Sequence, residues 1–404
     1  MIRFLTAGES HGKGLTTIVE GFPSNLEITA EYIDAQLKRR QAGYGRGQRM
    51  KIESDHVEIL SGIRDQKTLG SPISLFIENK DWQNWEDILS ADKINKRIDR
   101  VTVPRPGHAD LVGTEKYNYN DIRNSIERSS ARETAARVAA CSIARKFLEE
   151  FDIQIGSFVY SIGGVEPKNN FADKLLLNKQ VSKFDAGSMS MKADKSPVRV
   201  FDKEHEEKII KKIQTAKKKG DTLGGKFYVV ATGVPAGLGS FVHYDRKLNA
   251  SIAHAISSIN AVKGMEIGMG FEAGDKFGSE VHDEIINKNG ELTRKTNRAG
   301  GIEGGVSTGL PIIVSAAMKP IATLMSPIGA VDLATMKRIK SRRERSDFVA
   351  VPACAVIAES MLAWVIAEHF MMKFGGDSME ETKDNYNTYL KNSKKRLLRN
   401  FKKR

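Results

Sequence analysis

Apolar residues recur along this chain at two different spacings. In short segments they alternate with polar residues or form unbroken apolar runs. Both patterns are typical of β-strands, because successive side chains of a strand point to opposite faces of its sheet. This pattern predicts strands at residues 2–7, 15–21, 56–62, 72–78, 155–163, 226–232 and 311–318.

In longer segments the apolar residues recur every three or four positions, which is the spacing of one face of an α-helix. Residues 29–42 show this spacing together with both limits of a helix, because Thr29 suits the N-cap and Gly43 suits the end. The same pattern predicts further helices at residues 121–150, 203–219, 245–262 and 351–374.

Strands and helices do not alternate regularly enough for a doubly wound parallel sheet, so their order predicts a mixed α+β fold. Residues 166–200 are polar and weakly patterned, and we expect loops and short pieces there. The longest apolar run, 348–367, contains Pro352 and Glu359, which favours a buried helix of a soluble protein over a membrane span. From about residue 376 the chain turns polar and is expected to leave the core.

The net charge of +13 is unevenly distributed along the chain. Residues 391–404 carry eight Lys and Arg and no acid, so the residues before them account for only +5. We expect this tail to be a solvated or frayed end, with contact to RNA, a membrane or a neighbouring subunit as alternatives. The body of the protein is only mildly basic, which weakens the case for nucleic-acid binding.

Cysteine usage and the N-terminus bear on the compartment. Cys141 and Cys354 lie far apart, and no disulfide framework or metal-ligand spacing is visible. The first ten residues lack the charged and then apolar layout of a signal peptide. These features predict a cytoplasmic protein without a metal site.

The stretch ERSSARETAARVAA at 127–140 is suited to an anionic ligand. Its serines fit a helix start, where exposed N–H groups bind anions, and Arg132 and Arg137 add guanidinium forks that match phosphate and carboxylate. Its alanines would let another backbone or a flat ligand approach closely. The alternative is a tightly packed core helix that carries surface arginines.

Two histidines lie in turns rich in glycine or proline. His11 belongs to GESHG at 8–12, and its side chain suits a general acid, although a turn histidine bonded to a carbonyl would look the same. His108 belongs to PRPGHAD at 104–110, where two prolines and a glycine would hold it and Arg105 in defined places.

Residues 35–52 contain six cations and no acid, and glycines interrupt them. A glycine loop with forked guanidinium donors is suited to clamp a polyanion, and part of the charge is ordinary for a helix C-terminus. The segment itself leaves a small anionic molecule and a nucleic acid both open. Its only aromatic residue is Tyr44, which disfavours binding of single-stranded nucleic acid.

Three late features complete the set of candidate sites. The glycine-rich stretch 298–309 either lines a flat ring system or forms tight turns, and it lacks the layout of a dinucleotide fold or a P-loop. Lys319–Thr323 set a cation and a hydroxyl on a turn after a strand. Asp347 precedes the apolar helix, where it is either a helix N-cap or a catalytic base.

These motifs, in this order, resemble chorismate synthase from residue 1 to about 379. The resemblance rests on GESHG, GYGRGQRM, PRPGHAD, RSSARETAARVAA, GDTLGG, AVKGMEIG, AGGIEGGVSTG, KPIAT, RSD and KFGGDSME. It implies a single-domain β-α-β sandwich over residues 1–380, with a polar, basic tail at 381–404, and a homotetramer. It does not account for the basic tail.

The resemblance also implies an activity. Chorismate synthase is a carbon–oxygen lyase acting on phosphates in the shikimate pathway, which leads to aromatic amino acids. It converts 5-enolpyruvylshikimate 3-phosphate to chorismate by 1,4-anti elimination of phosphate, and it requires reduced FMN. A substrate with a phosphate and two carboxylates would explain clustered arginines without a nucleic acid.

Carried over residue by residue, the resemblance implies a role for each motif. His108 would protonate the departing phosphate, His11 would serve the flavin as an acid beside Ser10, and Asp347 would assist loss of the ring proton near flavin N5. The implied flavin-binding residues are Arg128, Ser129, Ser130, Asn260, Ala261, Gly304, Lys319, Pro320, Ile321, Ala322, Thr323 and Arg345. Arg40 and Arg46 match positions assigned to NADP, and together with Arg49 and Arg132 they would surround the substrate.

Two other functions are weighed against this lyase. A nucleic-acid-binding protein would need no flavin and would lose affinity steeply with salt. A non-catalytic homologue that binds flavin or an anion would have lost its acid and base residues, whereas His11, His108 and Asp347 are all present. The source of electrons is open between NADPH and an external supply, which is favoured because no segment resembles an appended reductase.

Overall fold

The computed structural model describes residues 1–46, 54–177, 184–288, 290–343 and 347–401. Its first sheet is antiparallel and is built from the N-terminal segments. In spatial order its strands are β1 (Arg3–Ala7), β2 (Gly14–Glu20), β6 (Ile73–Glu78) and β3 (Val57–Ser61). Leu15, Val19 and Leu75 are buried and alternate with half-buried or exposed residues, so one face of this sheet is buried, as the period-two pattern predicts.

The second sheet is also antiparallel and comes from the middle of the chain. In spatial order its strands are β7 (Gln154–Ile162), β8 (Gly225–Thr232), β14 (Ile312–Met318) and β9 (Val262–Ile267). Its three longer strands are buried along most of their length, because this sheet is covered on both faces. The structure thereby confirms every strand that the sequence predicts. It adds β9 to this sheet and several strands of two to four residues outside the two sheets.

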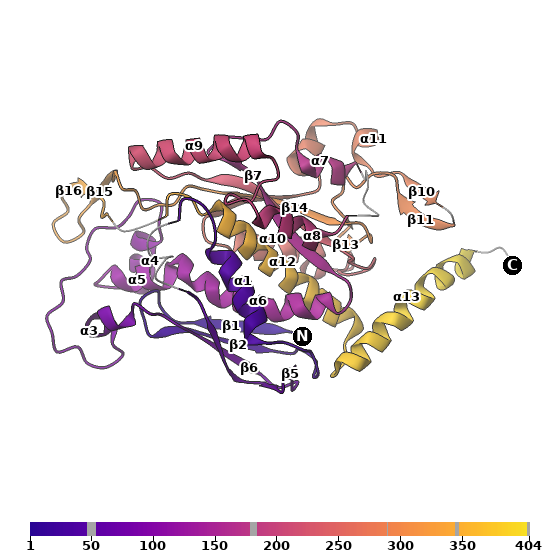
Figure 1. The fold of residues 1–404 in the computed structure, drawn as a ribbon, viewed down its shortest axis with the longest axis horizontal. Coiled ribbons are helices and arrows are strands. Elements are labelled where there is room, and N and C mark those ends of the chain that lie inside the picture. The colour runs from indigo at the N-terminus through magenta and orange to yellow at the C-terminus, as the bar shows by residue number, and fades with distance from the viewer. Residues whose placement is uncertain (47–53, 178–183, 289, 344–346, 402–404) are drawn as a thin grey trace.

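Four helices form the layer between the two sheets: α1 (Ala30–Gln41), α6 (Thr134–Glu149), α10 (Leu248–Ser257) and α12 (Val351–Phe374). Helix α6 packs against β2 and α12, while α12 packs in turn against β7 and β8. Figure 1 shows the resulting order, with β1, β2 and β6 below, α1, α6 and α12 in the middle, and β7 and β14 above. The fold is therefore a β-α-β sandwich, as predicted.

Helix α12 is the only helix of the described residues that is long and apolar enough to cross a membrane, and 94% of its apolar window is buried inside the fold. The prediction that this run forms a core helix is confirmed. The alanines of α6, including Ala135, Ala136 and Ala139, have no exposed surface, so the small side chains serve helix–helix packing.

Short helices cover the outer face of the second sheet. Helices α7 (Phe171–Leu176) and α8 (Ala186–Asp194) bury Ala172 and Met189 with Phe158 of the sheet. The sequence left residues 166–200 as loops and short pieces, and the helices there are too short to show an apolar period. Each begins at a capping side chain, Asn170 in α7 and Asp185 in α8.

The prediction of one continuous helix over 121–150 is wrong. The segment breaks into α5 (Arg123–Ser129), a 3₁₀ turn η2 (Ala131–Glu133) and α6. Ser130 lies between them in an extended conformation, with ψ 143°, and its side chain accepts a hydrogen bond from the backbone N–H of Arg132. A serine that caps the next turn competes with helix continuation, and apolar periodicity does not register this.

The helix predicted at 245–262 is shorter in the structure. It runs only over α10, and Ala261 with φ +68° turns the chain into β9. Helices α9 (Lys203–Lys219) and α12 both have the predicted bounds, and both pack against β7.

Short elements complete the body: β4 (Ile63–Arg64), β5 (Lys67–Thr68), η1 (Trp82–Asn84), α3 (Glu86–Leu89), α4 (Asp110–Tyr117), η4 (Tyr244–Arg246), η5 (Gly270–Asp275), α11 (Gly278–Val281), β10 (Ile285–Lys288), β11 (Glu291–Arg294), β12 (Ile302–Glu303), β13 (Val306–Ser307), β15 (Gly329–Val331) and β16 (Arg338–Lys340).

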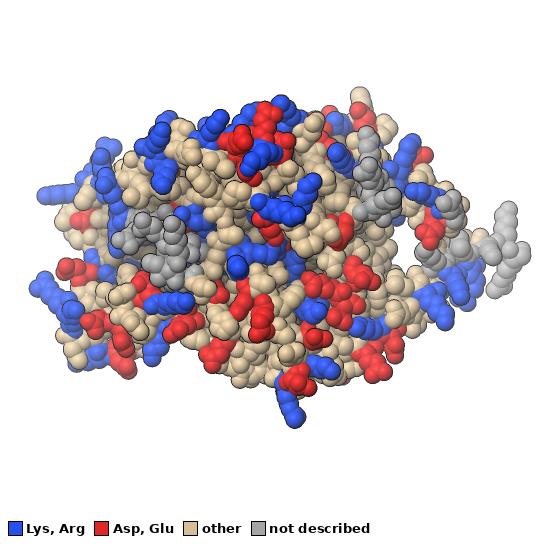
Figure 2. Space-filling model, viewed as in Figure 1, with Lys and Arg blue, Asp and Glu red and all other residues tan. Residues whose placement is uncertain are grey.

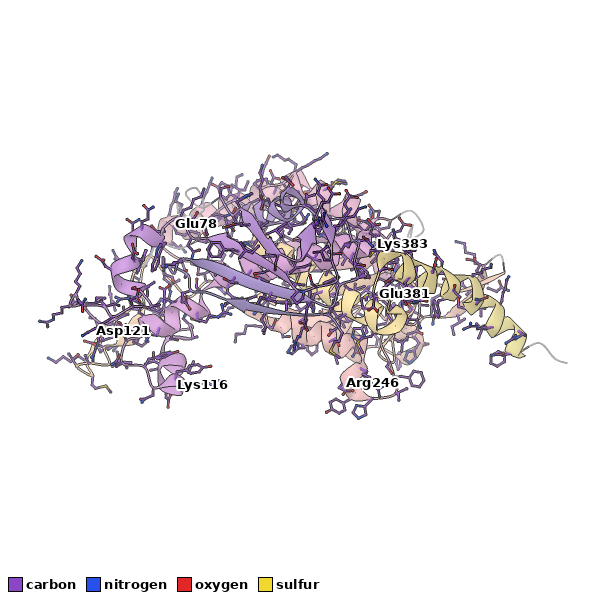
Figure 3. All side chains as sticks on the ribbon, turned by 90° about the horizontal axis from the view of Figure 1, so that it is seen from below. Glu78, Lys116, Asp121, Arg246, Glu381 and Lys383 are labelled. Carbon is purple, nitrogen blue, oxygen red and sulfur yellow. The ribbon has the colours of Figure 1, made fainter. Side chains whose placement is uncertain are left out.

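The C-terminal segment forms a helix, α13 (Met379–Phe401), which projects from the body in Figure 1. Its start is anchored, because Tyr386 makes an edge-to-face ring contact with Phe374 and Lys383 pairs with Glu150 at 2.8 Å. Glu381 and Lys383 mark this anchored end in Figure 3. The end of the helix gathers Lys and Arg side chains away from the body in Figure 2, as expected for a solvated tail.

Candidate functional site

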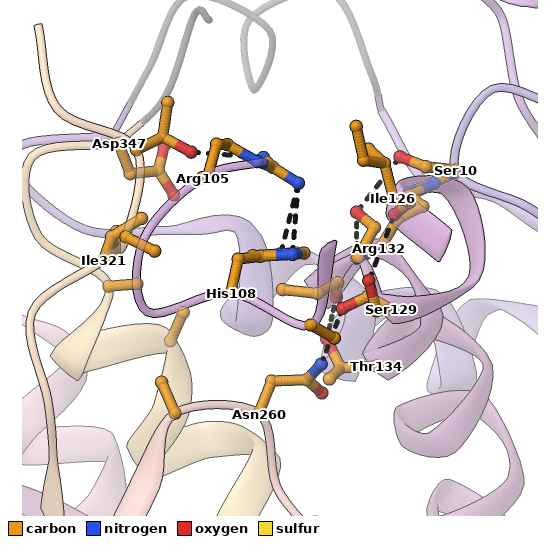
Figure 4. Close-up of a pocket in the computed structure, with 18 of the residues that line it drawn as sticks. Ser10, Arg105, His108, Ile126, Ser129, Arg132, Thr134, Asn260, Ile321 and Asp347 are labelled. Carbon is orange, nitrogen blue, oxygen red and sulfur yellow. Dashed lines mark hydrogen bonds between the residues drawn. The ribbon is translucent and has the colours of Figure 1, made fainter. Parts of the chain in front are cut away.

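A pocket of about 860 Å³ opens at one end of the helix layer. Loops after strands and the ends of helices converge on it: the loop after β1, the end of α1, the loop before α4, the α5–α6 break, the turn after β14 and the start of α12. The volume is at the upper end of the range for small-molecule sites. Figure 4 shows part of its lining, with His108 between Arg105 on one side and Ser129 and Arg132 on the other.

Most of the predicted site residues line this one pocket, although they are far apart in the sequence. The predicted residues found in its lining are Ser10, His11, Arg40, Arg46, His108, Ser129, Ser130, Arg132, Asn260, Ala261, Lys319, Pro320, Ile321, Ala322, Thr323 and Asp347. The break at Ser130 brings Ser129 and Arg132 into this lining, which a continuous helix would not do in the same way.

The remaining predicted residues lie elsewhere. Arg128 is not in the lining and donates from its guanidinium to the backbone carbonyls of Gly8 and Thr6, at 2.9 and 2.8 Å. Gly304 lies in the turn between β12 and β13, also outside the lining, so this glycine-rich stretch forms tight turns. Arg49 and Arg345 fall outside the described residues.

A buried carboxylate holds two of the pocket arginines together. Asp55 accepts a hydrogen bond from Arg40 at 2.6 Å and another, on its other oxygen, from Arg132. Burial by itself would raise the pKa of Asp55, but the two guanidinium groups outweigh it and the pKa lies below its usual value. Asp55 therefore stays ionised and offsets the repulsion between the two cations.

Asn79, at the end of the first sheet, joins Arg132 to the GESHG turn. Its side-chain oxygen accepts from Nε of Arg132 at 2.8 Å, while its NH₂ group donates to the carbonyls of Glu9 and Gly12 at 3.0 and 2.8 Å. Asn79 thus fixes both Arg132 and the turn that carries Ser10. Ser10 in turn accepts from the hydroxyl of Ser130 at 3.1 Å.

The ring nitrogen Nδ1 of His11 is bonded to a carboxylate. Its Nδ1 lies 2.9 Å from Oε1 of Glu127, and its backbone N–H donates to Oε2 of the same residue at 2.8 Å. The imidazole also stacks on Trp85, with ring centroids 4.1 Å apart. Glu127 and Trp85 thus fix the orientation of the ring from two sides.

His108 has a similar partner. Its Nδ1 lies 2.6 Å from Oδ1 of Asp110, which has no exposed surface. Arg105 forks onto the same carboxylate, with Nε and Nη2 at 2.8 and 2.9 Å. Burial acts to raise the pKa of Asp110, but hydrogen bonds from His108 and Arg105 outweigh it and hold the pKa well below its usual range.

Asp347 pairs with Arg46 at 3.1 Å. The N-cap position of α12 is Ala350, and no side chain caps it, so the expectation that Asp347 is a helix cap is wrong. The backbone N–H of Phe348 donates to the carbonyl of Gly45 at 2.9 Å, which joins the segment of Arg46 to that of Asp347. The carboxylate thereby faces the pocket beside a cation.

The turn at 319–323 closes another wall of the pocket. Lys319 donates from Nζ to the carbonyl of Gly107, and burial together with nearby Lys263 lowers its pKa. The hydroxyl of Thr323 accepts from Arg105 at 3.2 Å. The turn and the PRPGHAD loop, more than two hundred residues apart, therefore support each other.

Two arginine N–H donors that line the pocket are suited to bind an anion. The Nε atoms of Arg40 and Arg46 are buried, and neither has a hydrogen-bond partner among the described residues. A buried donor without a partner is costly, and a phosphate or carboxylate oxygen would satisfy it. Apolar side chains also line this pocket, including Ile259, Met318 and Ile357, and they offer a wall for a flat ring.

Several lining residues are absent from the sequence-based assignment. Arg123, Arg342 and Arg343 add cations to the pocket, while Trp85 and Glu127 hold His11. Arg342 and Arg343 lie five and four positions before Asp347 in the sequence, so the positive charge of that segment was a usable signal. Glu127 and Trp85 carried none, because their partner is distant in the sequence. Among the described residues, no three His, Cys, Asp or Glu side chains form a group that could hold a metal ion.

Comparison with known proteins gives a consistent result. The family profile described as chorismate synthase matches residues 2–371. The chain is 54% identical over 394 residues to the chorismate synthase of Chloroherpeton thalassium, covering 96% of this chain and 99% of that one. It is 51% identical over 402 residues to the chorismate synthase of Aquifex aeolicus, covering 97% and 98%. A crystal structure of a chorismate synthase superposes with a TM-score of 0.78 at 44% identity, covering 98% of each chain.

Proposed function

Because the chain belongs to the chorismate synthase family, we propose that it converts 5-enolpyruvylshikimate 3-phosphate to chorismate by 1,4-anti elimination of phosphate, dependent on reduced FMN. This reaction makes it a lyase of the shikimate pathway, which supplies aromatic amino acids. One observation carries the proposal most directly. Two candidate proton donors, a carboxylate and a cluster of arginines line the same pocket.

The substrate's phosphate and carboxylates match the cations of the pocket. Arg40, Arg46 and Arg132 are the proposed contacts, and the buried Nε atoms of the first two lack partners among the described residues. Guanidinium groups held in place before the reaction stabilise phosphate as it gains charge on leaving. Arg49 is proposed to join them, although it lies outside the described residues.

FMN is proposed to be held by Ser129, Ser130, Asn260, Ala261 and the turn at 319–323, all of which line the pocket. Reduced flavin, when bound, supplies transient electron density for cleavage of the carbon–oxygen bond. Arg128, Gly304 and Arg345 are part of the same assignment from the resemblance, but Arg128 and Gly304 do not line the pocket. NADPH, at Arg40 and Arg46, is proposed as an alternative to an external source of electrons.

The protein's own side chains are proposed to move the protons. His108 protonates the departing phosphate, and Asp347 accepts the ring proton that is lost. His11, beside Ser10, acts as an acid toward the flavin. Supporting this assignment, all four side chains line the pocket, and Nδ1 of each histidine is bonded to a carboxylate.

The assembly and location are also proposals. Two points support a cytoplasmic protein: Cys141 and Cys354 are free and buried, and α12 is a core helix. For a homotetramer the support is the outer face of the first sheet, where no helix crosses the strands in Figure 3. Leu5 and Ile18 pair across β1 and β2 on that face and are 71% and 45% exposed.

The test is an anaerobic assay with 5-enolpyruvylshikimate 3-phosphate and dithionite-reduced FMN, following chorismate absorbance and phosphate release. We expect both products in equal amounts. Repeating the assay with NADPH and oxidised FMN separates self-reduction from an external supply. Folded, flavin-binding protein that forms no chorismate would instead be a binding scaffold, and salt-sensitive binding of nucleic acid without flavin would favour the nucleic-acid alternative.

The proton-transfer roles make a sharper prediction. His108→Ala and Asp347→Ala should each lower kcat by about 10²–10⁴-fold, the usual contribution of a general acid or base, with flavin affinity nearly unchanged. His243→Ala is the matched control, because His243 also pairs with an aspartate but is exposed and outside the pocket. Parallel loss of flavin binding and turnover would contradict the assigned roles.

A further inference from the structure

The two pocket histidines share an arrangement that their motifs do not reveal. Nδ1 of His11 lies 2.9 Å from Glu127 on α5, and Nδ1 of His108 lies 2.6 Å from Asp110 at the start of α4. Both carboxylates are buried, with 4% and 0% of their side-chain surface exposed. Each histidine is therefore bonded through the same ring nitrogen to a buried carboxylate. Nη2 of Arg105 also lies 3.1 Å from Nδ1 and 3.4 Å from Nε2 of His108. Because a guanidinium only donates, an Nδ1–H ring can accept from it at Nε2 alone.

A carboxylate selects one tautomer of a neutral imidazole. An ionised carboxylate can only accept hydrogen bonds, so the ring nitrogen beside it must carry the proton. The lone pair of each neutral ring then lies on Nε2, the nitrogen across the ring from the carboxylate. When such a ring gains a second proton, the proton is on Nε2 and is given back from there.

The carboxylates are themselves held in place. Asp110 accepts from the backbone N–H of Arg105 at 2.9 Å in addition to the guanidinium fork. Glu127 accepts from the backbone N–H of His11 at 2.8 Å, and its own carbonyl accepts from the backbone N–H of Ser10 at 3.1 Å. Each pair is thus fixed by main-chain bonds as well as by the side chains.

We propose that Glu127 and Asp110 are positioning residues that hold His11 and His108 as Nδ1–H tautomers, so that both rings exchange protons with the pocket through Nε2. The proposal rests on the function proposed above, because it gives these histidines their proton-transfer roles. Neither carboxylate is proposed to touch substrate or flavin. Their effect is to fix the direction in which each ring donates.

The two pairs differ in their charge balance. The charge of Asp110 is shared with Arg105, which is itself buried, so loss of this charge leaves a buried guanidinium with a weaker partner. Among the described residues, the Glu127 carboxylate is hydrogen-bonded only by His11. Glu127→Gln should therefore leave the fold intact, whereas Asp110→Asn should also destabilise it.

The experiment uses the full chain labelled with ¹⁵N-histidine, sedimented and observed by magic-angle-spinning NMR at about pH 9, where imidazole rings are largely neutral. The chain has eight histidines, and His11→Ala and His108→Ala assign the two signals. The variants are Glu127→Gln and Asp110→Asn. The matched control is Asp245→Asn, which makes the same change in an exposed pair with the same two-residue spacing as His108 and Asp110.

We expect both pocket histidines to be Nδ1–H tautomers in the unmodified protein. Glu127→Gln should give His11 a mixture of tautomers without changing His108, and should lower kcat at least tenfold with KM within about threefold. Asp110→Asn should act on His108 alone, and Asp245→Asn should leave both rings and turnover unchanged. An Nε2–H tautomer in the unmodified protein, or unchanged tautomers in both variants, would overturn the proposal.

The spectra need neither substrate nor flavin, so they separate this proposal from the proposed function. If the unmodified protein makes no chorismate but the tautomers shift as expected, the proposed reaction fails and the positioning role stands. If chorismate forms and Glu127→Gln is as active as the unmodified protein, the positioning role fails alone. Melting curves of each variant identify any loss of kcat that comes from unfolding.

Discussion

Glu359 lies in the middle of α12 with no exposed surface, and it is the most heavily bonded carboxylate of the core. Arg39 forks onto it at 2.8 and 3.0 Å, and Arg145 and Arg199 bind it at 2.7 and 3.0 Å. Burial acts to raise the pKa of Glu359, but the arginines outweigh it and hold the pKa well below its usual range. Burial lowers the pKa of Arg199 to about 10. Because Arg39 precedes Arg40 in α1, this cluster also fixes the helix turn that feeds the pocket.

Glu359→Gln should lower the free energy of unfolding by about 3–5 kcal/mol at neutral pH, because it removes the buried negative charge that Arg39, Arg145 and Arg199 share. The direction in which this stabilisation changes with pH follows from the lowered pKa of Glu359. The stabilisation is fully present above the ordinary glutamate pKa and is lost as pH falls through the lower folded value. Urea titrations of both proteins should show a constant difference from neutral pH down to about pH 5, and a shrinking one below it.

Glu368→Gln, on the same helix, is the matched control. Burial raises the pKa of Glu368, so ionisation of this side chain costs stability above the ordinary glutamate pKa. The glutamine variant should be as stable as the unmodified protein or slightly more stable at neutral pH. Equal destabilisation by both substitutions would show that helix packing, and not the ion cluster, decides the effect.

Among the helices, α13 divides into an anchored start and a projecting end. Met379 is 5% exposed, and Tyr386 and Tyr389 both make edge-to-face ring contacts with Phe374. Beyond them, Leu390 and Leu397 are 44% and 47% exposed. The basic end therefore adds charge to the surface without adding to the core.

Two shortened chains test this division. A chain that ends after Leu390 should melt within about 2 °C of the full chain and keep its activity, since none of the side chains described in residues 391–401 is buried. A chain that ends after Ser378 loses Met379 and both tyrosines, which together should cost about 3 kcal/mol or more. Calorimetry of the two shortened chains measures their melting temperatures. A large loss of stability on removing residues 391–404 alone would show that the basic end packs against another part of the protein.

For the assembled molecule, the outer face of the first sheet is the candidate contact between subunits. Ile18→Lys, with Leu5→Lys in the same chain, places two charges on that face and should reduce the proposed tetramer of 44.7 kDa subunits to smaller species. Sedimentation velocity measures the change. Met191→Lys on α8 is the control, because Met191 is 64% exposed but lies away from this sheet. A tetramer that survives the double substitution would exclude this face.

Much of the fold could be predicted because its elements are local patterns. All strands of the two sheets except β9, and helices α9 and α12 with their bounds, follow from apolar spacing alone. The motifs were specific enough to indicate the family, and most of the site residues they named line one pocket. The break at Ser130 and the helix α13 were not predicted, because a capping serine and a polar helix carry no apolar period.

The sequence by itself determined which side chains are available: the histidines, the arginines and Asp347. The tertiary structure alone decided their partners, since Glu127 meets His11 across 116 positions, Asp55 joins Arg40 to Arg132, and Asp347 pairs with Arg46 instead of capping α12. The physical reason is that apolar periodicity depends on near neighbours along the chain. Hydrogen bonds and ion pairs depend on distance in space, which exists only after the sheets and helices have packed.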